Sequence, residues 1–135
     1  MMPPRIHVVL GSIDDVDADL TVLPGRRPHV DGRVVTVRAP RWQAPDGPER
    51  AIAQAYRDAV AAASDRGAIS LAVPAVLARG LWPIDQSIHV ALRVFDSTPS
   101  TVQAVTVVAR SPGMLERWAE ALIARDRWSG RRATP

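Results

Sequence analysis

Short apolar runs rich in valine and isoleucine predict five β-strands, each bounded by glycine, proline or polar residues. The predicted strands are Ile6–Leu10, Asp19–Leu23, Val34–Val37, Ala68–Val73 and Val102–Val108. The run at 68–73 carries apolar residues on both faces, which is typical of a strand buried inside a sheet. Between the second and third runs, the polar stretch 26–33 contains an Asp31-Gly32 pair and predicts a turn.

Apolar residues recur at helical spacing in three other stretches. Asp46 or Gly47 is expected to cap a helix that runs from Pro48 to Arg66 and ends at Gly67. A second helix is expected over 84–95, and a third after the Ser111-Pro112 cap. The expected inward-facing residues are Ile52, Ala55, Tyr56, Ala59, Val60 and Ala63 in the first helix, Ile84, Ile88, Ala91, Leu92 and Phe95 in the second, and Met114, Leu115, Trp118, Leu122 and Ile123 in the third.

This alternation of helices and strands predicts a parallel sheet with right-handed crossovers and helices on its faces. Ligands of such sheets bind beyond the carboxyl ends of the strands. Here that edge is formed by the loop from Pro74 to Pro83, together with the segments after Leu23 and Val108. A chain of 135 residues, 47% apolar, fits one domain, which we place at 1–128, followed by an Arg-rich tail at 129–135 that is expected to be disordered.

The amino-acid composition limits the kinds of partner and the cellular location that we expect for this chain. The chain has no cysteine, which removes disulfides and thiolate chemistry, and no apolar run long enough to span a bilayer, so we expect a cytoplasmic protein. All 17 basic residues are arginine, yet the formal charge is only +3. The surplus lies in 110–135, so a nucleic-acid contact through residues 127–135 is conceivable, although a solvated tail is the favoured interpretation.

Few residues suggest catalysis or metal binding. Asp14, Asp15, Asp17 and Asp19 lack the glycine and terminal glutamate of a calcium loop, so a solvated turn is favoured. The three histidines are scattered, and none is paired at a helical ligand spacing. No nucleophile elbow is present. We therefore predict no catalytic residue, no metal and no cofactor.

Several segments, in order, resemble the macro domain family of ADP-ribose-binding modules. The opening 11–20 is similar to the family's "GDI…DVDAIV" start, and VVTVRAPRW at 34–42 resembles "yVIHAVGPRW". The most specific match is AIAQAYRDAVAAASDRGAISLAVP at 51–74, which resembles "LaeaYrsslelAaehgirSIAFP". The resemblance implies a three-layer α/β fold with a mixed, mostly parallel sheet flanked by helices, in a truncated form.

The departures from the family fall on its ligand-handling parts. Ser12 replaces the aspartate that receives the adenine amino group. The family's "NAAN" motif is absent, because Leu23-Pro24-Gly25-Arg26 stands in its place and the chain contains no asparagine. The helix and glycine-rich diphosphate loop that follow in the family are missing too. Only Val30-Asp31-Gly32 resembles the end of that loop, and a plain turn explains it equally well.

The second phosphate-binding loop is partly retained, since PAVLARGLWP at 74–83 resembles "PAISTGIYGYP". The resemblance places a ligand beside Ser12, Pro74, Ala75, Val76, Arg79, Gly80, Leu81 and Trp82. Arg79 is expected either to contact a phosphate or to remain a solvated loop charge. Trp82 is expected either to stack on a ribose or base or to plug the core.

Two functions remain open from the sequence. The first is a degenerate, non-catalytic macro-like module that binds ADP-ribose or a related phosphorylated ligand weakly. The second is a scaffold for protein contact or homodimerisation, with no small-molecule ligand, that uses the surface left by the missing helix.

Overall fold

The computed structural model describes residues 3–40, 47–78 and 82–133, with side chains as far as Arg127. In chain order the elements are β1 (Arg5–Leu10), the short helix η1 (Ile13–Asp15), β2 (Leu20–Gly25), β3 (His29–Asp31), β4 (Val34–Arg38), α1 (Pro48–Asp65), β5 (Ser70–Pro74), α2 (Ile84–Ser97), β6 (Ala104–Ala109) and α3 (Pro112–Ala133). All five predicted strands and all three predicted helices are present within these residues.

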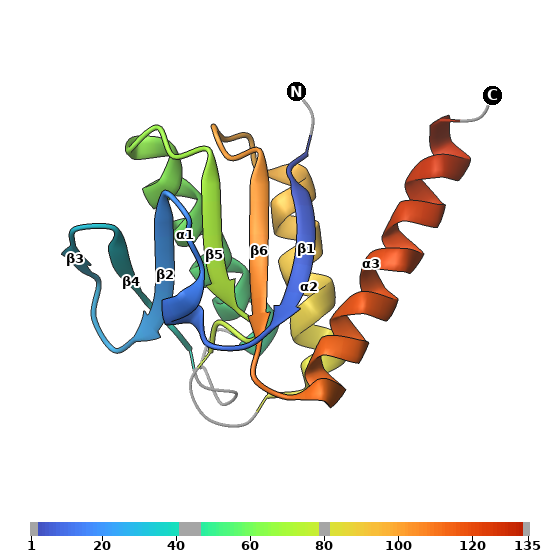
Figure 1. The fold of residues 1–135 in the computed structure, drawn as a ribbon, viewed down its shortest axis with the longest axis horizontal. Coiled ribbons are helices and arrows are strands. Elements are labelled where there is room, and N and C mark those ends of the chain that lie inside the picture. The colour runs from blue at the N-terminus through green and yellow to red at the C-terminus, as the bar shows by residue number, and fades with distance from the viewer. Residues whose placement is uncertain (1–2, 41–46, 79–81, 134–135) are drawn as a thin grey trace.

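The strands form one six-stranded sheet in the order β1-β6-β5-β2-β4-β3. Every pair is parallel except β3 with β4. In Figure 1, α1 and α2 lie behind the sheet, the segment with η1 crosses in front of it, and α3 runs along the β1 edge. The predicted three-layer α/β fold with a mixed, mostly parallel sheet is confirmed, and the carboxyl ends of five strands meet at one edge.

The glycine and proline residues at the ends of helix α1 explain its bounds, and its apolar stripe explains which face is buried. Gly47 precedes the helix with a φ of 94°, Pro48 occupies the first turn, and Gly67 follows the end with a φ of 63°, a backbone region that favours glycine. All six residues of the predicted stripe are at most 3% exposed. In β5, Leu71, Ala72 and Val73 are fully buried, as expected for a strand covered on both faces.

The connection between β2 and β3 is only three residues long, 26–28. It therefore has no room for the helix and glycine-rich loop of the macro domain family. The predicted Asp31-Gly32 turn is confirmed, with Gly32 at a φ of 59°, but it joins β4 to the additional strand β3. Strand β3 was not predicted because Pro28, His29 and Asp31 are residue types that indicate a polar loop rather than a strand.

The last helix differs from expectation in two respects. Ile123 is 53% exposed, so the prediction that it faces inward is wrong, whereas Trp118 is fully buried. Because α3 has packing partners on one side only, its buried stripe is narrow, and Ile123 lies outside it. In addition, the helical backbone continues to Ala133, through most of the segment expected to be a disordered tail. The domain boundary at residue 128 stays a prediction.

Candidate functional site

The carboxyl edge of the sheet brings together three segments that are distant in sequence. The Gly11 amide, just after β1, donates to the Ala109 carbonyl at 2.9 Å, and the Ala75 amide, just after β5, donates to the Val108 carbonyl at 3.0 Å. The ends of β1, β6 and β5 are therefore in register. This arrangement places Ser12 and the Pro74–Val76 segment at the same edge, where the sequence predicts ligand contacts.

Ser12 is exposed at this edge, but its hydroxyl already has a local role. Its Oγ accepts a hydrogen bond of 3.4 Å from the Asp14 amide and caps η1. A hydroxyl oxygen can accept more than one hydrogen bond, so a contact with a ligand remains open to it. Its part in binding stays a prediction.

Two aromatic residues of the core hold the loop that follows β5 by hydrogen bonds. Trp118 of α3 donates from Nε1 to the Ala75 carbonyl at 2.9 Å, and the Leu77 amide donates to the Tyr56 hydroxyl at 3.4 Å. Both aromatic side chains are fully buried, which confirms their predicted core positions. Pro74 and Val76 are half-buried and Ala75 is buried, so the start of this loop is packed into the edge of the sheet.

Tyr56 belongs to the same buried cluster. Its ring meets that of Phe95 edge to face, with centroids 5.6 Å apart and planes at 75°. Burial raises the pKa of Tyr56 to about 12, although the hydrogen bond from the Leu77 amide opposes this effect. The phenol is therefore neutral at physiological pH and positions the loop as an uncharged group.

Arg79, Gly80 and Leu81, the centre of the predicted phosphate loop, lie outside the described residues. Trp82, which follows them, is 8% exposed and packs within the hydrophobic core. This burial fits a core plug better than a ring that stacks on a ligand, because stacking would require the indole to leave the core.

Several residues at this edge were not predicted to bind a ligand. Helix α3 begins here, and Ser111 caps it by accepting a 3.3 Å hydrogen bond from the Met114 amide. Helix α2 also begins at this edge, after Pro83. Helix N-termini carry partial positive charge and favour anions. One indication of the start of α3 was present in the sequence, since the segment after Val108 was expected at this edge.

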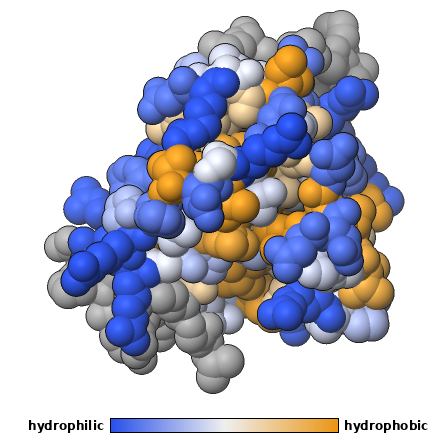
Figure 2. Space-filling model, turned by 60° about the vertical axis from the view of Figure 1, so that its left-hand side comes forward, coloured by the Kyte–Doolittle hydropathy of each residue, from blue (hydrophilic) through white to orange (hydrophobic). Residues whose placement is uncertain are grey.

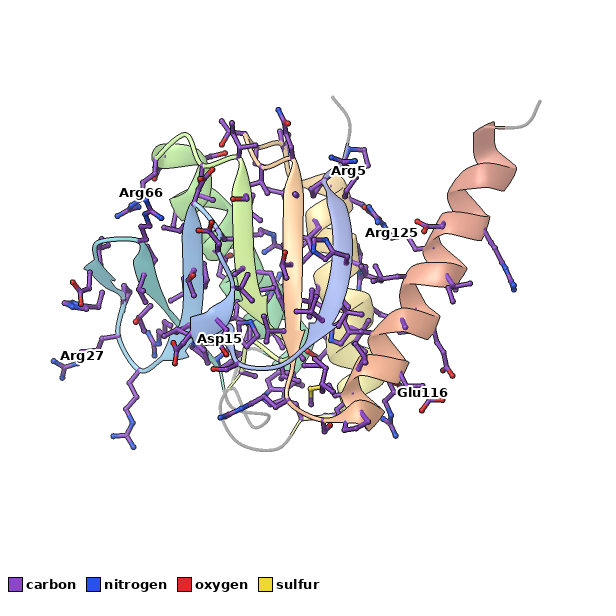
Figure 3. The ribbon with its side chains drawn as sticks, in the orientation of Figure 1. Arg5, Asp15, Arg27, Arg66, Glu116 and Arg125 are labelled. Atoms are coloured by element: carbon purple, nitrogen blue, oxygen red, sulfur yellow. The ribbon has the colours of Figure 1, made fainter. Side chains whose placement is uncertain are left out.

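Charge at the edge is mixed. Exposed arginines follow or end three of the strands, namely Arg26 and Arg27 after β2, Arg38 at the end of β4 and Arg110 after β6. Figure 3 shows Arg27 beyond the lower end of β2 and Asp15 of η1 in front of the sheet near the strand ends. Within the described residues, no group of three or more His, Cys, Asp or Glu side chains is arranged to hold a metal ion.

Gly25 ends β2 at this edge, at the place of the missing asparagine motif. A Cβ added there would overlap the Thr36 methyl group of β4. A larger residue at position 25 would therefore require the Thr36 side chain to shift. No described helix is long and apolar enough to cross a membrane.

Comparison with solved structures shows that this chain has the macrodomain fold. A mutant Oceanobacillus iheyensis macrodomain with ADPR superimposes with a TM-score of 0.74 at 18% identity, covering 89% of this chain and 92% of that one. The GDAP2 macro domain gives 0.69 at 12% identity, with 84% and 81% covered. A Trypanosoma brucei macrodomain in complex with ADP gives 0.66 at 11% identity, with 87% and 69% covered. No family model and no curated protein matches the sequence.

Proposed function

We propose that the protein is a non-catalytic macro-like module that binds ADP-ribose or a related phosphorylated ligand at the carboxyl edge of its sheet. The observation that carries this proposal is the macrodomain fold, which brings two helix N-termini and the anchored 74–78 loop to that edge. Backbone amides at such ends favour phosphate groups. Solved macrodomains of the same fold contain ADPR or ADP.

The non-catalytic part rests on what the ligand edge lacks. The chain contains no asparagine, and the three residues between β2 and β3 leave no first phosphate loop. Ser12 offers a neutral hydroxyl where a carboxylate would form a stronger, charge-assisted hydrogen bond. Loss of these contacts predicts weak affinity and no cleavage of ADP-ribosyl bonds. We also propose a cytoplasmic location, which the absence of cysteine favours.

Calorimetric titration with ADP-ribose tests the binding. We expect a weak, saturable heat that decreases in Arg110→Gln and persists in Arg5→Gln, a matched loss of charge at the opposite end of the parallel strands. Absence of heat at millimolar ligand would exclude the nucleotide. Incubation with an ADP-ribosylated protein is expected to release no ADP-ribose, and release above the spontaneous rate would show that the module is an enzyme.

A second candidate function is homodimerisation through the β3–β4 edge. Strand β3 is the outermost strand of the sheet, and two large apolar residues of this hairpin are exposed, Val30 at 52% and Val34 at 37%. Figure 2 brings this side of the molecule forward and shows a band of apolar side chains between hydrophilic ones. Exposed apolar side chains at an unpaired strand edge can form a contact with a second copy of the chain. Light scattering would show a dimer that Val30→Glu dissociates, whereas a strict monomer would exclude this function.

A further inference from the structure

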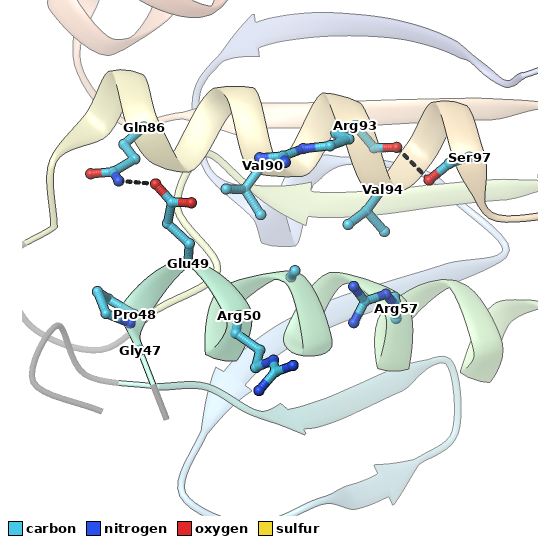
Figure 4. A pocket seen from close by; sticks show the side chains of 11 residues that line it. Gly47, Pro48, Glu49, Arg50, Arg57, Gln86, Val90, Arg93, Val94 and Ser97 are labelled. Atoms are coloured by element: carbon cyan, nitrogen blue, oxygen red, sulfur yellow. Dashed lines mark hydrogen bonds between the residues drawn. The ribbon is translucent and has the colours of Figure 1, made fainter. Parts of the chain in front are cut away.

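A groove of about 650 Å³ lies between α1 and α2 (Figure 4), and none of residues 74–78 lines it. We call it the α1–α2 groove. Its lining residues are Gly47, Pro48, Glu49, Arg50, Ala53, Arg57, Gln86, Val90, Arg93, Val94 and Ser97. Pockets for small molecules enclose roughly 300–1,000 Å³. The groove is therefore large enough for a small ligand.

The groove has an apolar floor and polar walls. Val90 and Val94 are 2% and 4% exposed, and Ala53 is half-buried beside them. The polar side chains of Glu49, Arg57 and Arg93 rise from the two helices around this floor (Figure 4). An apolar floor with a few polar groups above it is the usual composition of a ligand pocket.

No carboxylate among the described residues forms an ion pair with Arg57 or Arg93 of the groove. Arg57 donates one hydrogen bond of 3.3 Å, to the neutral Gln54 side chain, and the Arg93 guanidinium has no bonded partner among the described residues. By contrast, Arg117 and Arg125 of α3 are each paired with a carboxylate of α2. Most N–H groups of Arg57 and Arg93 therefore remain available to an anion.

A hydrogen bond between side chains spans one end of the groove. The Gln86 side chain donates a hydrogen bond to the Glu49 carboxylate, which joins α2 to α1 across the groove (Figure 4). This bridge would block a long helical peptide that continued past it, so the groove favours a compact ligand. The Glu49 charge also repels anions from this end, which directs an anionic group toward Arg57 and Arg93.

We propose that the α1–α2 groove binds a compact small molecule with a phosphate or carboxylate group, held between Arg57 and Arg93 over the Val90 and Val94 floor. Guanidinium groups bind both types of oxyanion through paired N–H donors. One end of the groove reaches the first turns of α1 and α2, whereas Arg57 and Arg93 each lie nine residues further along their helices, so the anion position does not depend on ADP-ribose binding.

The test is a nuclear magnetic resonance titration of the isotope-labelled protein with pyrophosphate in one arm and malonate in the other. We expect saturable shifts in residues 53–57 and 90–97 with at least one of these ions, and the arm that binds identifies the anion class. The double variant Arg57→Gln/Arg93→Gln should weaken binding about tenfold or more, since two charge-assisted contacts are lost. The matched variant Arg5→Gln/Arg127→Gln removes the same charge elsewhere and should bind as the wild type does.

Two outcomes would overturn the proposal. One is the absence of saturable shifts in the groove with both ions. The other is equal weakening in both double variants, which would reduce the effect to general attraction by net charge. Both variants change exposed side chains, and their circular dichroism and melting temperature confirm that each is folded before the titration. Shifts at the carboxyl edge are scored separately, so failure of this site and failure of ADP-ribose binding are distinguishable.

Discussion

Arg125 of α3 binds both carboxylate oxygens of Asp96, in the last turn of α2. Its Nε lies 3.0 and 3.1 Å from the two oxygens, and Nη2 lies 2.6 Å from one of them. The same Nη2 donates to the Pro4 carbonyl at 3.3 Å. Figure 3 shows Arg125 on the side of α3 that faces β1. One guanidinium thus joins α3, α2 and the segment that leads into β1.

We expect Arg125→Ala to lower the free energy of unfolding by about 1–2 kcal/mol. This loss is smaller than that expected for a fully buried charged pair, because the Asp96 side chain is 39% exposed. Arg117→Ala is the matched control on the same helix. Its partner Asp85 is 3.7 Å away and both side chains are more than half exposed, so the change should stay within about 0.5 kcal/mol. Urea denaturation measures the free energy of unfolding of both variants. Equal effects would contradict the role of Arg125 in joining α3, α2 and the segment before β1.

Asp19 joins the start of β2 to the start of β5, where the two strands share only two residue pairs. Its Oδ2 accepts hydrogen bonds from the amides of Ile69 at 2.9 Å and Ser70 at 3.2 Å, and these bonds lower the pKa of the carboxyl. A group with a lowered pKa stabilises the fold above its unfolded pKa, and this contribution is lost as pH falls through the folded value.

Asp19→Asn should therefore unfold at lower urea concentration than the wild type at neutral pH, and the difference should shrink below about pH 4. Asp17→Asn is the control, since Asp17 accepts no hydrogen bond from the described residues. A difference between wild type and Asp19→Asn that stays constant with pH would show that the charge of Asp19 contributes nothing.

Tyr56 is the single tyrosine of the chain, so the ultraviolet absorbance of tyrosinate reports on it alone. Its pKa is raised to about 12 in the folded protein, against an ordinary value of 10.0. The folded state then binds more protons between these values, so stability falls as pH rises through them. We expect phenolate to form near pH 12 or together with unfolding. In denaturant it should form near 10, and equal titration in both conditions would disprove burial of the hydroxyl.

Trp118→Phe should leave the Ala75 carbonyl without its buried donor and lower the free energy of unfolding by about 1–3 kcal/mol. Because this bond holds the start of the 74–78 loop, the substitution should also weaken binding of ADP-ribose in calorimetry. Leu122→Ala is the control, since it removes a core side chain of the same helix that does not bond to the loop. Equal loss of affinity in both variants at matched stability would contradict a positioning role.

The sequence predicts the fold well where local signals agree. The stripe of α1 is confirmed because helical periodicity, Pro48 and the flanking glycines all indicate the same helix. Strand β3 was missed because its pairing with β4, rather than its own residues, makes it a strand. The inward prediction for Ile123 failed because periodicity gives the direction of a face and not its width.

The sites are harder to predict from the sequence than the fold. The edge that carries Ser12 and Pro74 follows from topology, since carboxyl ends of parallel strands share one edge. The α1–α2 groove does not, because Arg57 and Arg93 look like ordinary solvated residues of two separate helices. Only the packing of α1 beside α2 brings them to one groove. The Arg125–Asp96 pair cannot be predicted from the sequence for the same reason, because its two residues lie on separate helices.

The order of strands in the sheet has a consequence for synthesis on the ribosome. Strand β1 is at the sheet edge, and its partner is β6, whose residues 104–109 emerge almost one hundred residues later. The growing chain therefore carries an unpaired strand β1 until residues 104–109 have been synthesised. Such a strand is exposed to pairing with other chains during that interval. Chaperones that bind extended apolar segments would act on residues 5–10 until the sheet can close.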